Sequence, residues 1–326
     1  MRVLVTGAAG FIGYHVARAL LARGDEVCGI DNVNDYYSVA LKRARLAQLA
    51  TFQGFEFHEI DIADREAVEK VLGGQKGIAG IIHLAAQAGV RYSLINPYAY
   101  ARSNVMGHVV LLEAARRIDS LRSFVYASSS SVYGGNKNQP FSVEDRVDDP
   151  ISLYAATKRA SELASISYAH LYQMPLTGLR YFTVYGPWGR PDMAAYLFAD
   201  AIVAGRPIDV FNEGRMARDF TYIDDIVAGT VAALDRPPSG PMPHRLFNLG
   251  NHRPENLLHF IEVLERALGR KANRRLLPLQ PGDVLESYAE IEASRRDLGF
   301  EPTTPIEVGI PRFVEWYRDY HGLDRI

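Results

Sequence analysis

The sequence predicts an α/β fold, with a doubly wound parallel sheet in the first part of the chain and a smaller mixed α/β lobe after it. In the first part, short runs of β-branched and other apolar residues alternate with stretches of helical length. These runs lack a period-2 alternation, which indicates strands that helices cover on both faces. After Arg180, prolines and glycines become frequent and the helical stretches become shorter.

The individual elements follow from these runs. We expect strands at 3–5, 26–30, 55–60, 80–84, 123–127 and 176–179. We expect helices near 11–23, 38–50, 64–72, 98–118, 153–172, 193–204, 223–234, 256–268 and 306–320. One domain is therefore placed at 1–180 and a second lobe at 181–326. This boundary is approximate, because segments of the second lobe can return strands to the first sheet.

The composition is that of a soluble globular protein with ample material for a core. Of 326 residues, 48% are hydrophobic and 23% are charged, and the net charge of −2 argues against nucleic-acid or membrane-surface partners. The single cysteine, Cys28, allows neither an intrachain disulfide nor a multi-cysteine zinc site, so we expect it in the core and expect no metal. The chain has no signal-peptide pattern and no apolar run of about 18 residues, so we expect a cytoplasmic protein.

A glycine-rich loop follows the first expected strand. Its glycines, Gly7, Gly10 and Gly13, stand three residues apart. Glycines allow a tight turn and let the backbone approach a pyrophosphate, while the helix that follows offers free N–H groups and the positive end of its dipole. We therefore expect a dinucleotide at Gly7, Gly10, Phe11, Ile12 and Gly13.

Asp31 stands at the end of the second expected strand and is followed by Asn32. A carboxylate at this position accepts hydrogen bonds from the ribose 2′-OH of NAD and repels the 2′-phosphate of NADP. No arginine follows directly, and the next basic residues are Lys42 and Arg43. We therefore predict NAD as the cofactor, with Asp31 and Asn32 at its ribose. The alternative is that Asp31 is only a turn residue.

Tyr154 and Lys158 lie near the start of the expected helix 153–172, four residues apart and so on one face. A free tyrosine has a pKa of about 10 and is a poor base at neutral pH. A nearby ammonium favours the phenolate, and Lys158 can also hold the nicotinamide ribose. The serine run 128–131 follows the fifth strand, at the sheet edge where ligands bind. We therefore predict that Tyr154 and Lys158 are catalytic.

Longer segments resemble a known family over essentially the whole chain. The Gly-x-x-Gly-x-x-Gly spacing is similar to that of the extended short-chain dehydrogenases/reductases, and segment 178–187 resembles the NAD-dependent epimerase/dehydratase family. Segments 86–93, 128–131, 182–193 and 280–283 are most similar to the UDP-glucuronate 4-epimerases. The resemblance implies a Rossmann-type fold, bound NAD and a UDP-sugar substrate.

The resemblance also implies roles for single residues. Ser129 would hydrogen-bond the sugar oxygen beside Tyr154, with Ser130 and Ser131 as alternatives. Arg91 or Arg190 would bind the substrate carboxylate, although Arg190 could instead pair with Asp192 in its loop. Further NAD contacts are implied at Asp61, Ile62, Leu84, Ala85, Ala86, Asn104 and Tyr181. Substrate contacts are implied at Arg91, Ser129, Ser130, Thr183, Arg190, Val210, Phe211, Arg218 and Asp283.

Two serines limit which of the family's reactions this chain is expected to catalyse. Where the related 4,6-dehydratases carry an Asp-Glu pair and the glucuronate decarboxylases a Glu, this chain has Ser130 and Ser131. Chemistry should therefore stop at C4, and we expect NAD-dependent 4-epimerisation of UDP-glucuronate to UDP-galacturonate through a 4-keto intermediate. Thr183 and Gln280 depart from the UDP-galactose type and favour the uronate. The alternatives are a UDP-hexose 4-epimerase, acting on glucose/galactose or N-acetyl sugars, and a non-catalytic NAD-binding subunit.

The helices near 98–118 and 153–172 carry apolar residues on more than one face, among them Val109, Leu112, Leu163 and Ile166. Related enzymes pair these helices across a dimer interface, so the resemblance implies a homodimer. Ordinary packing against the sheet is the alternative.

Overall fold

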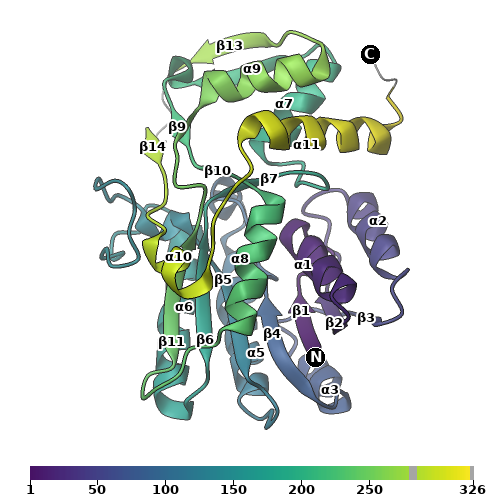
Figure 1. The fold of residues 1–326 in the computed structure, drawn as a ribbon, viewed down its shortest axis with the longest axis vertical. Helices are drawn as coiled ribbons and strands as arrows, with labels where there is room; N and C mark the ends of the chain where they lie inside the picture. The colour runs from purple at the N-terminus through teal and green to yellow at the C-terminus, as the bar shows by residue number, and fades with distance from the viewer. Residues whose placement is uncertain (279–284, 324–326) are drawn as a thin grey trace.

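The computed structural model describes residues 1–278 and 285–323, and its centre is a seven-stranded parallel sheet (Figure 1). All neighbouring strands in it run parallel. Their order is β11 (His244–Leu249), β6 (Leu176–Tyr181), β5 (Ser123–Ser129), β4 (Ile78–His83), β1 (Arg2–Thr6), β2 (Glu26–Asp31) and β3 (Phe55–Glu59). The order reverses between β1 and β4, which opens a crevice at the carboxyl ends of these strands. The predicted doubly wound sheet is confirmed.

Helices cover both faces of this sheet, as the unbroken apolar runs predicted (Figure 1). Val3 and Val5 of β1 pack into the cluster that contains residues of α1, α2 and α8, whereas Leu4 packs into the cluster that contains residues of α3, α5 and α6. The helices are α1 (Phe11–Ala22), α2 (Val39–Leu49), α3 (Arg65–Gly74), α5 (Gly107–Ala115), α6 (Leu153–Tyr172) and α8 (Ile223–Asp235).

The expected helix 98–118 is not one regular helix. It consists of α4 (Pro97–Tyr100), the π-helical turn η2 (Ala101–Met106) and then α5. A π-turn widens a helix locally and shifts the side chains on it, often at functional sites. The turn places Asn104 inside the protein, where its side chain is buried.

The second lobe lies above the sheet in Figure 1 and is built from small sheets and four helices of the described residues. Its parallel pair β8 (Pro207–Phe211) and β13 (Asn273–Leu277) lies with α7 (Ala194–Val203) and α9 (Leu257–Leu268). The chain passes from β6 into β7 (Thr183–Tyr185) before it reaches α7, and β7 pairs in parallel with β10 (Phe220–Tyr222). The other members are η4 (Asn212–Gly214), β9 (Ala217–Arg218), β12 (Glu255–Asn256), β14 (Glu286–Ser287), α10 (Glu292–Leu298) and α11 (Ile306–His321).

The chain returns from the second lobe to the sheet through α8 and β11, and β11 pairs in parallel with β6. Such a return was expected from the sequence, whereas β11 and α10 were not. The division of the chain at residue 180 stays a prediction. Within residues 1–278 and 285–323, no helix combines the length and apolar character that crossing a membrane needs.

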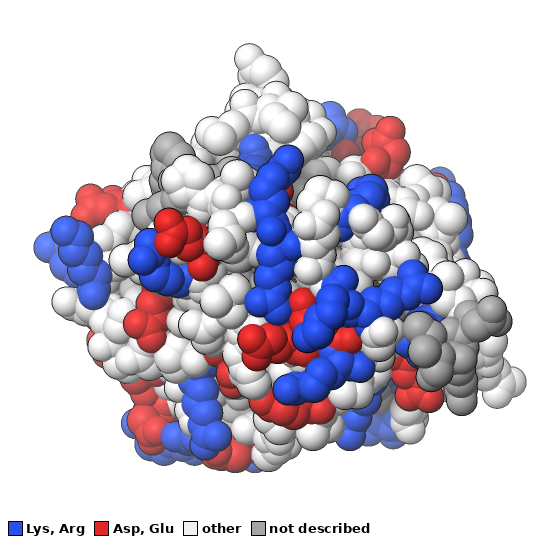
Figure 2. Space-filling model, turned by 90° about the horizontal axis from the view of Figure 1, so that it is seen from above, with Lys and Arg blue, Asp and Glu red and all other residues white. Residues whose placement is uncertain are grey.

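The face of the second lobe seen in Figure 2 mixes basic and acidic side chains. Several of the lobe's cations pair with carboxylates, as Arg275 does with Asp209 and Arg274 with Glu265. This face therefore carries no uniform field of one sign.

Candidate active site

A cavity of about 960 Å³ lies where the carboxyl ends of the central strands meet the second lobe. Its wall brings together residues that are far apart in the sequence, from the glycine loop to Arg218. The predicted site residues that line it are Gly7, Gly10, Phe11, Ile12, Gly13, Asp31, Asn32, Asp61, Ile62, Leu84, Ala85, Ala86, Arg91, Ser129, Ser130, Tyr154, Lys158, Tyr181, Thr183, Arg190 and Arg218.

The glycine loop has a backbone that side chains would disrupt. Gly7 has a φ of +75°, and a Cβ on it would lie 2.8 Å from the backbone nitrogen of Ala85. A Cβ on Gly13 would lie 2.0 Å from the carbonyl oxygen of Gly7. Helix α1 begins after Gly10 with no side-chain cap, so its first N–H groups are directed to the cavity side. The loop therefore fits the diphosphate of a dinucleotide.

Asp31 is oriented by two backbone amides at the end of β2. Its carboxylate accepts hydrogen bonds from the N–H groups of Val33 at 2.8 Å and Ala9 at 3.1 Å. Burial raises the pKa of Asp31, and these amides and the charge of Lys42 offset part of that effect. Lys42 also lines the cavity, with its ammonium bound to the carbonyl oxygen of Asn34 at 2.6 Å. The arrangement fits an adenosine ribose bound at Asp31.

Tyr154 and Lys158 lie on the first turns of α6, which Ser152 caps by accepting a hydrogen bond from the backbone N–H of residue 155 at 3.1 Å. Both residues line the cavity. The Lys158 ammonium donates to the carbonyl oxygen of Ala127 at 2.9 Å. Burial lowers the pKa of Lys158 to about 8.

The electrostatics of Tyr154 differ from the sequence-based expectation. We expected Lys158 to lower the pKa of the phenol, but burial is the largest effect and raises it. A hydrogen bond with Ser129 and the positive charge of Arg190 act in the opposite direction. Lys158 is itself desolvated, and its ammonium is bound to the carbonyl oxygen of Ala127.

The serine run ends β5 and continues into the short helix η3 (Ser130–Tyr133). The Ser129 hydroxyl lies 3.2 Å from the Ser131 hydroxyl and accepts from the Ser131 N–H at 3.2 Å. Ser128 instead donates to the buried carboxylate of Glu162 at 2.6 Å. Ser129, Ser130 and Ser131 therefore remain for a ligand, and Ser128 belongs to the packing beneath the site.

The ion pair below the serines was missed by the sequence analysis. Arg180 donates to both oxygens of Glu162, at 2.8 and 2.9 Å, and both side chains are buried. Glu162 stands four residues after Lys158 on α6, so helical spacing could have found it. The pair links α6, which carries Tyr154 and Lys158, to β6.

The three predicted arginines have different surroundings. Arg190 binds Asp192 through two guanidinium nitrogens, which is the alternative considered for it, and still lines the cavity. The Arg91 guanidinium lies 5.4 Å from the ring centre of Phe211. Arg218 donates to the carbonyl oxygen of Ala217 at 3.0 Å.

Three predicted contact residues do not line the cavity. The Asn104 amide donates to the carbonyl oxygen of Gln87 and the hydroxyl of Thr157, each at 3.0 Å, so it holds the wall rather than facing the cavity. Val210 is fully buried in the core of the second lobe, because its strand turns this side chain inward. Phe211 lies beneath Arg91. Asp283 lies outside the described residues.

Several cavity residues were absent from the prediction, among them Tyr36, Lys42 and Gln87. Tyr36 and Lys42 follow the Asp31 turn, at the same sheet edge as the glycine loop. Their position after a strand of the binding crevice is a signal that could have found them.

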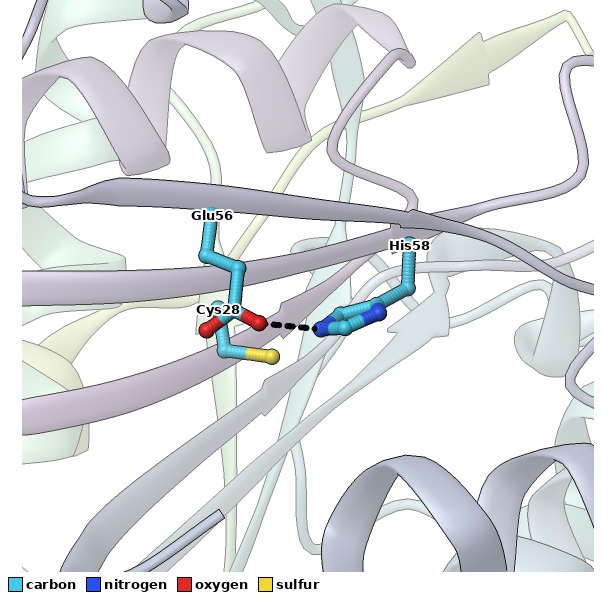
Figure 3. A group of neighbouring side chains, drawn as sticks. All are labelled: Cys28, Glu56 and His58. Carbon is cyan, nitrogen blue, oxygen red and sulfur yellow. Dashed lines mark ion pairs between the residues drawn. The ribbon is translucent and has the colours of Figure 1, made fainter. Parts of the chain in front are cut away.

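Another group of metal-ligating residue types lies on β2 and β3 (Figure 3). Cys28 is opposite Glu56 in the strand register, and His58 is two residues further along, so the three side chains share one face. The Glu56 carboxylate contacts His58 at 2.9 Å and Arg2 at 2.8 Å. Burial raises the pKa of Cys28 to about 12, so the thiol stays protonated. Ion pairing around Glu56 explains the cluster, and we assign no ligand to it.

Comparisons with known proteins point in one direction. Residues 3–250 match the model of the NAD dependent epimerase/dehydratase family. The chain is 48% identical to UDP-glucuronate 4-epimerase 4 of Arabidopsis thaliana, covering 99% of this chain and 76% of the plant protein. It is 47% identical to a probable UDP-glucuronate 4-epimerase of Rhizobium meliloti, covering 97% of each. The Bacillus cereus UDP-glucuronic acid 4-epimerase, solved with UDP-glucuronic acid and NAD, superposes with a TM-score of 0.90 at 35% identity, covering 98% and 100% of the two chains.

The family model spans most of the chain, and the relatives match it nearly from end to end. The cavity within the matched residues combines a glycine loop, Asp31 and the pair Tyr154 and Lys158. This protein therefore belongs to the NAD-dependent epimerase/dehydratase family.

Proposed function

We propose that this protein is a UDP-glucuronate 4-epimerase, which interconverts UDP-glucuronate and UDP-galacturonate. One observation carries the proposal: the glycine loop with Asp31, the pair Tyr154 and Lys158, and the serine hydroxyls beside Arg190 all line one cavity. The similarity to UDP-glucuronate 4-epimerases over nearly the whole chain supports this substrate.

The catalytic step centres on Tyr154. Its phenol takes the proton from the sugar 4-hydroxyl, and Ser129 hydrogen-bonds the same oxygen. NAD held by the glycine loop and Asp31 would supply the hydride acceptor for C4 and the hydride donor for its return. Lys158, fixed by the carbonyl of Ala127, holds the nicotinamide ribose. After the 4-keto sugar turns its other face, Tyr154 gives the proton back and C4 is inverted.

The serines have a second task in this scheme. A 4-keto uronic acid is a β-keto acid, and it loses CO₂ when its carboxylate bond stands perpendicular to the ketone plane. Ser130 and Thr183 can donate hydrogen bonds to the carboxylate and hold it away from that orientation, while the Ser129 hydroxyl serves the 4-oxygen. Ser130 and Ser131 also offer no carboxylate for proton transfer at C5, so the reaction ends at C4.

Incubation of the protein with UDP-glucuronate and, separately, with UDP-glucose tests the proposal. We expect UDP-galacturonate as the main product from the first and a rate at least about tenfold lower with the second, because a neutral sugar offers no carboxylate to Arg190 and the serine hydroxyls. Faster conversion of UDP-glucose would favour the UDP-hexose 4-epimerase. Absence of turnover with either sugar would favour a non-catalytic NAD-binding subunit.

We also propose that the protein is a cytoplasmic homodimer, paired through the segment near 98–118, which contains α4, η2 and α5, and through segment 153–172, which is α6. Large apolar side chains stand exposed on these elements: Tyr98 is 83%, Met106 55% and Leu163 52% exposed. Exposed apolar side chains gathered on adjacent helices are typical of an interface between subunits. The reducing environment of the cytoplasm suits a chain with one buried thiol.

A further inference from the structure

The loop 186–193, which carries Arg190, is attached to the first domain at three points. His15 of α1 and Arg45 of α2 hydrogen-bond backbone carbonyl groups of this loop. Tyr36 donates its hydroxyl to the Asp192 carboxylate at 2.9 Å. His15 follows β1, and Tyr36 and Arg45 follow β2. The glycine loop and Asp31 lie at the carboxyl ends of the same two strands. The loop with Arg190 is therefore joined directly to the cofactor side of the cavity.

Of these contacts, the hydrogen bond from Tyr36 is the one that connects to Arg190, because both residues bind Asp192. Asp192 accepts two hydrogen bonds from Arg190, one of them from Nε at 3.0 Å, and a third from Tyr36. Arg190 and Tyr36 both line the cavity. Burial and the charge of Asp192 raise the pKa of Tyr36 to about 12, so its hydroxyl remains a donor at neutral pH.

Tyr36 is itself held in place by its neighbours. Its ring packs on Tyr92 with a centroid distance of 4.8 Å. Its hydroxyl lies against Gly89, where a Cβ would approach to 2.5 Å, and Gly89 has a φ of +96°. The hydroxyl therefore has a fixed position between the loop after β2, the segment after β4 and the loop of Arg190.

We propose that Tyr36 is a positioning residue, which through Asp192 fixes the guanidinium of Arg190 beside Tyr154 and so sets the preference for an anionic sugar. This inference rests on the proposed function, because the group that Arg190 meets is the substrate carboxylate. Without the Tyr36 hydroxyl, Arg190 and Asp192 remain paired but can turn as a unit. A uronate then loses a well-placed partner, whereas a neutral sugar loses nothing.

The variant Tyr36→Phe tests this directly, since it keeps the ring and removes one hydroxyl. We expect the Kd of UDP-glucuronate for the NAD-loaded protein, measured by calorimetry, to rise about tenfold. The Kd of UDP-glucose and the NAD content should not change. Tyr92→Phe is the matched control, because it removes the hydroxyl of the adjacent ring, which contacts Asn96. It should leave both affinities unchanged.

A double-mutant cycle with Arg190→Met separates positioning from a general structural effect. If Tyr36 acts through Arg190, Tyr36→Phe changes the Kd of UDP-glucuronate less than about twofold in the Arg190→Met background. An equal loss in both backgrounds, or no loss in the wild type, overturns the proposal. Arg190→Lys serves as the second background if thermal denaturation shows that Arg190→Met is unfolded.

The same experiment tests the proposed function separately from the role of Tyr36. If the wild-type protein does not convert UDP-glucuronate, the proposed function fails. The cycle is still measured through the Kd of UDP-glucuronate, which requires no turnover. A Tyr36→Phe effect that persists without Arg190 then overturns the positioning role alone.

Discussion

In the proposed reaction, the phenol of Tyr154 accepts a proton from a buried position that favours its neutral form. Burial raises its pKa, and the groups that oppose this effect are Ser129 and Arg190. Lys158 is also desolvated, with its pKa lowered to about 8. The sequence could predict that Tyr154 and Lys158 share a helix face, because helical spacing is local. It could not predict that the charge of Arg190 acts on this phenol, because the two residues are distant in the sequence.

Replacing Tyr154 by phenylalanine should lower kcat for epimerisation at least about 100-fold, because the proton acceptor is removed. The NAD content and the Kd of UDP-glucuronate should stay within about twofold of the wild type, since burial of the ring is retained. Tyr168→Phe is the control on the same helix, where the hydroxyl contacts Glu113 away from the cavity. A Tyr154→Phe protein as active as the wild type would contradict the assigned role.

At the level of elements, the turn between β1 and α1 depends on atoms that a side chain would displace. A Cβ on Gly13 would meet the carbonyl oxygen of Gly7 at 2.0 Å. By contrast, a Cβ on Gly73, inside α3, would meet no other described part of the chain within 4 Å. Alanine should therefore fit at Gly73 and should not fit at Gly13.

Gly13→Ala should abolish the copurification of NAD and lower the melting temperature, because the loop has to shift away from the diphosphate. Gly73→Ala should leave NAD content unchanged and raise stability by about 0.5–1 kcal/mol, since alanine is the better helix former. NAD released on denaturation and thermal melting measure both effects. NAD binding by Gly13→Ala at wild-type stoichiometry would show that the loop has another role.

The elements themselves were largely predictable, because hydrophobic runs and turn residues are local signals. The first six strands of the sheet lie within three residues of their expected bounds. The interruption of helix 98–118 at η2 was not predictable, because it accompanies the hydrogen bond from Asn104 to Gln87, a residue that is distant in sequence. The strand β11 was missed because it fills the sheet edge only after the second lobe has folded back.

At the level of the whole molecule, several imidazoles are buried in a neutral form. Burial lowers the pKa of His15 to about 4, of His108 to about 3 and of His244 to about 4. In the unfolded chain these groups titrate near pH 6.5. Between about pH 6.5 and pH 4 the unfolded chain therefore binds more protons, so stability falls as the pH decreases. Asp219, whose pKa burial raises to about 6, acts in the opposite direction.

The free energy of unfolding should accordingly be about 3 kcal/mol lower at pH 5 than at pH 7. His15→Gln should reduce this loss, because the glutamine amide can still donate to the carbonyl of Pro187 without titrating. Urea denaturation at the two pH values measures both effects. Equal stability at pH 5 and pH 7, or a loss that His15→Gln leaves unchanged, would argue against neutral burial of these groups.

The proposed homodimer makes a separate prediction about the whole molecule. Leu163→Glu should shift the protein to a monomer in sedimentation experiments, because it places a charge in the apolar surface of α6. Leu197→Glu on α7 is the control, since that leucine is also 52% exposed but lies in the second lobe. A wild-type monomer, or dissociation by the control alone, would contradict the proposed interface.

The central claim is reversible hydride transfer at C4 of a UDP-uronate, and a deuterium label at that carbon tests it most directly. The protein is incubated with UDP-glucuronate deuterated at C4, and the products are separated and analysed by mass spectrometry and NMR. We expect UDP-galacturonate that retains the deuterium at C4, because the same hydride returns to the carbon that released it. Loss of the label to solvent, or release of a UDP-pentose in place of UDP-galacturonate, would contradict it.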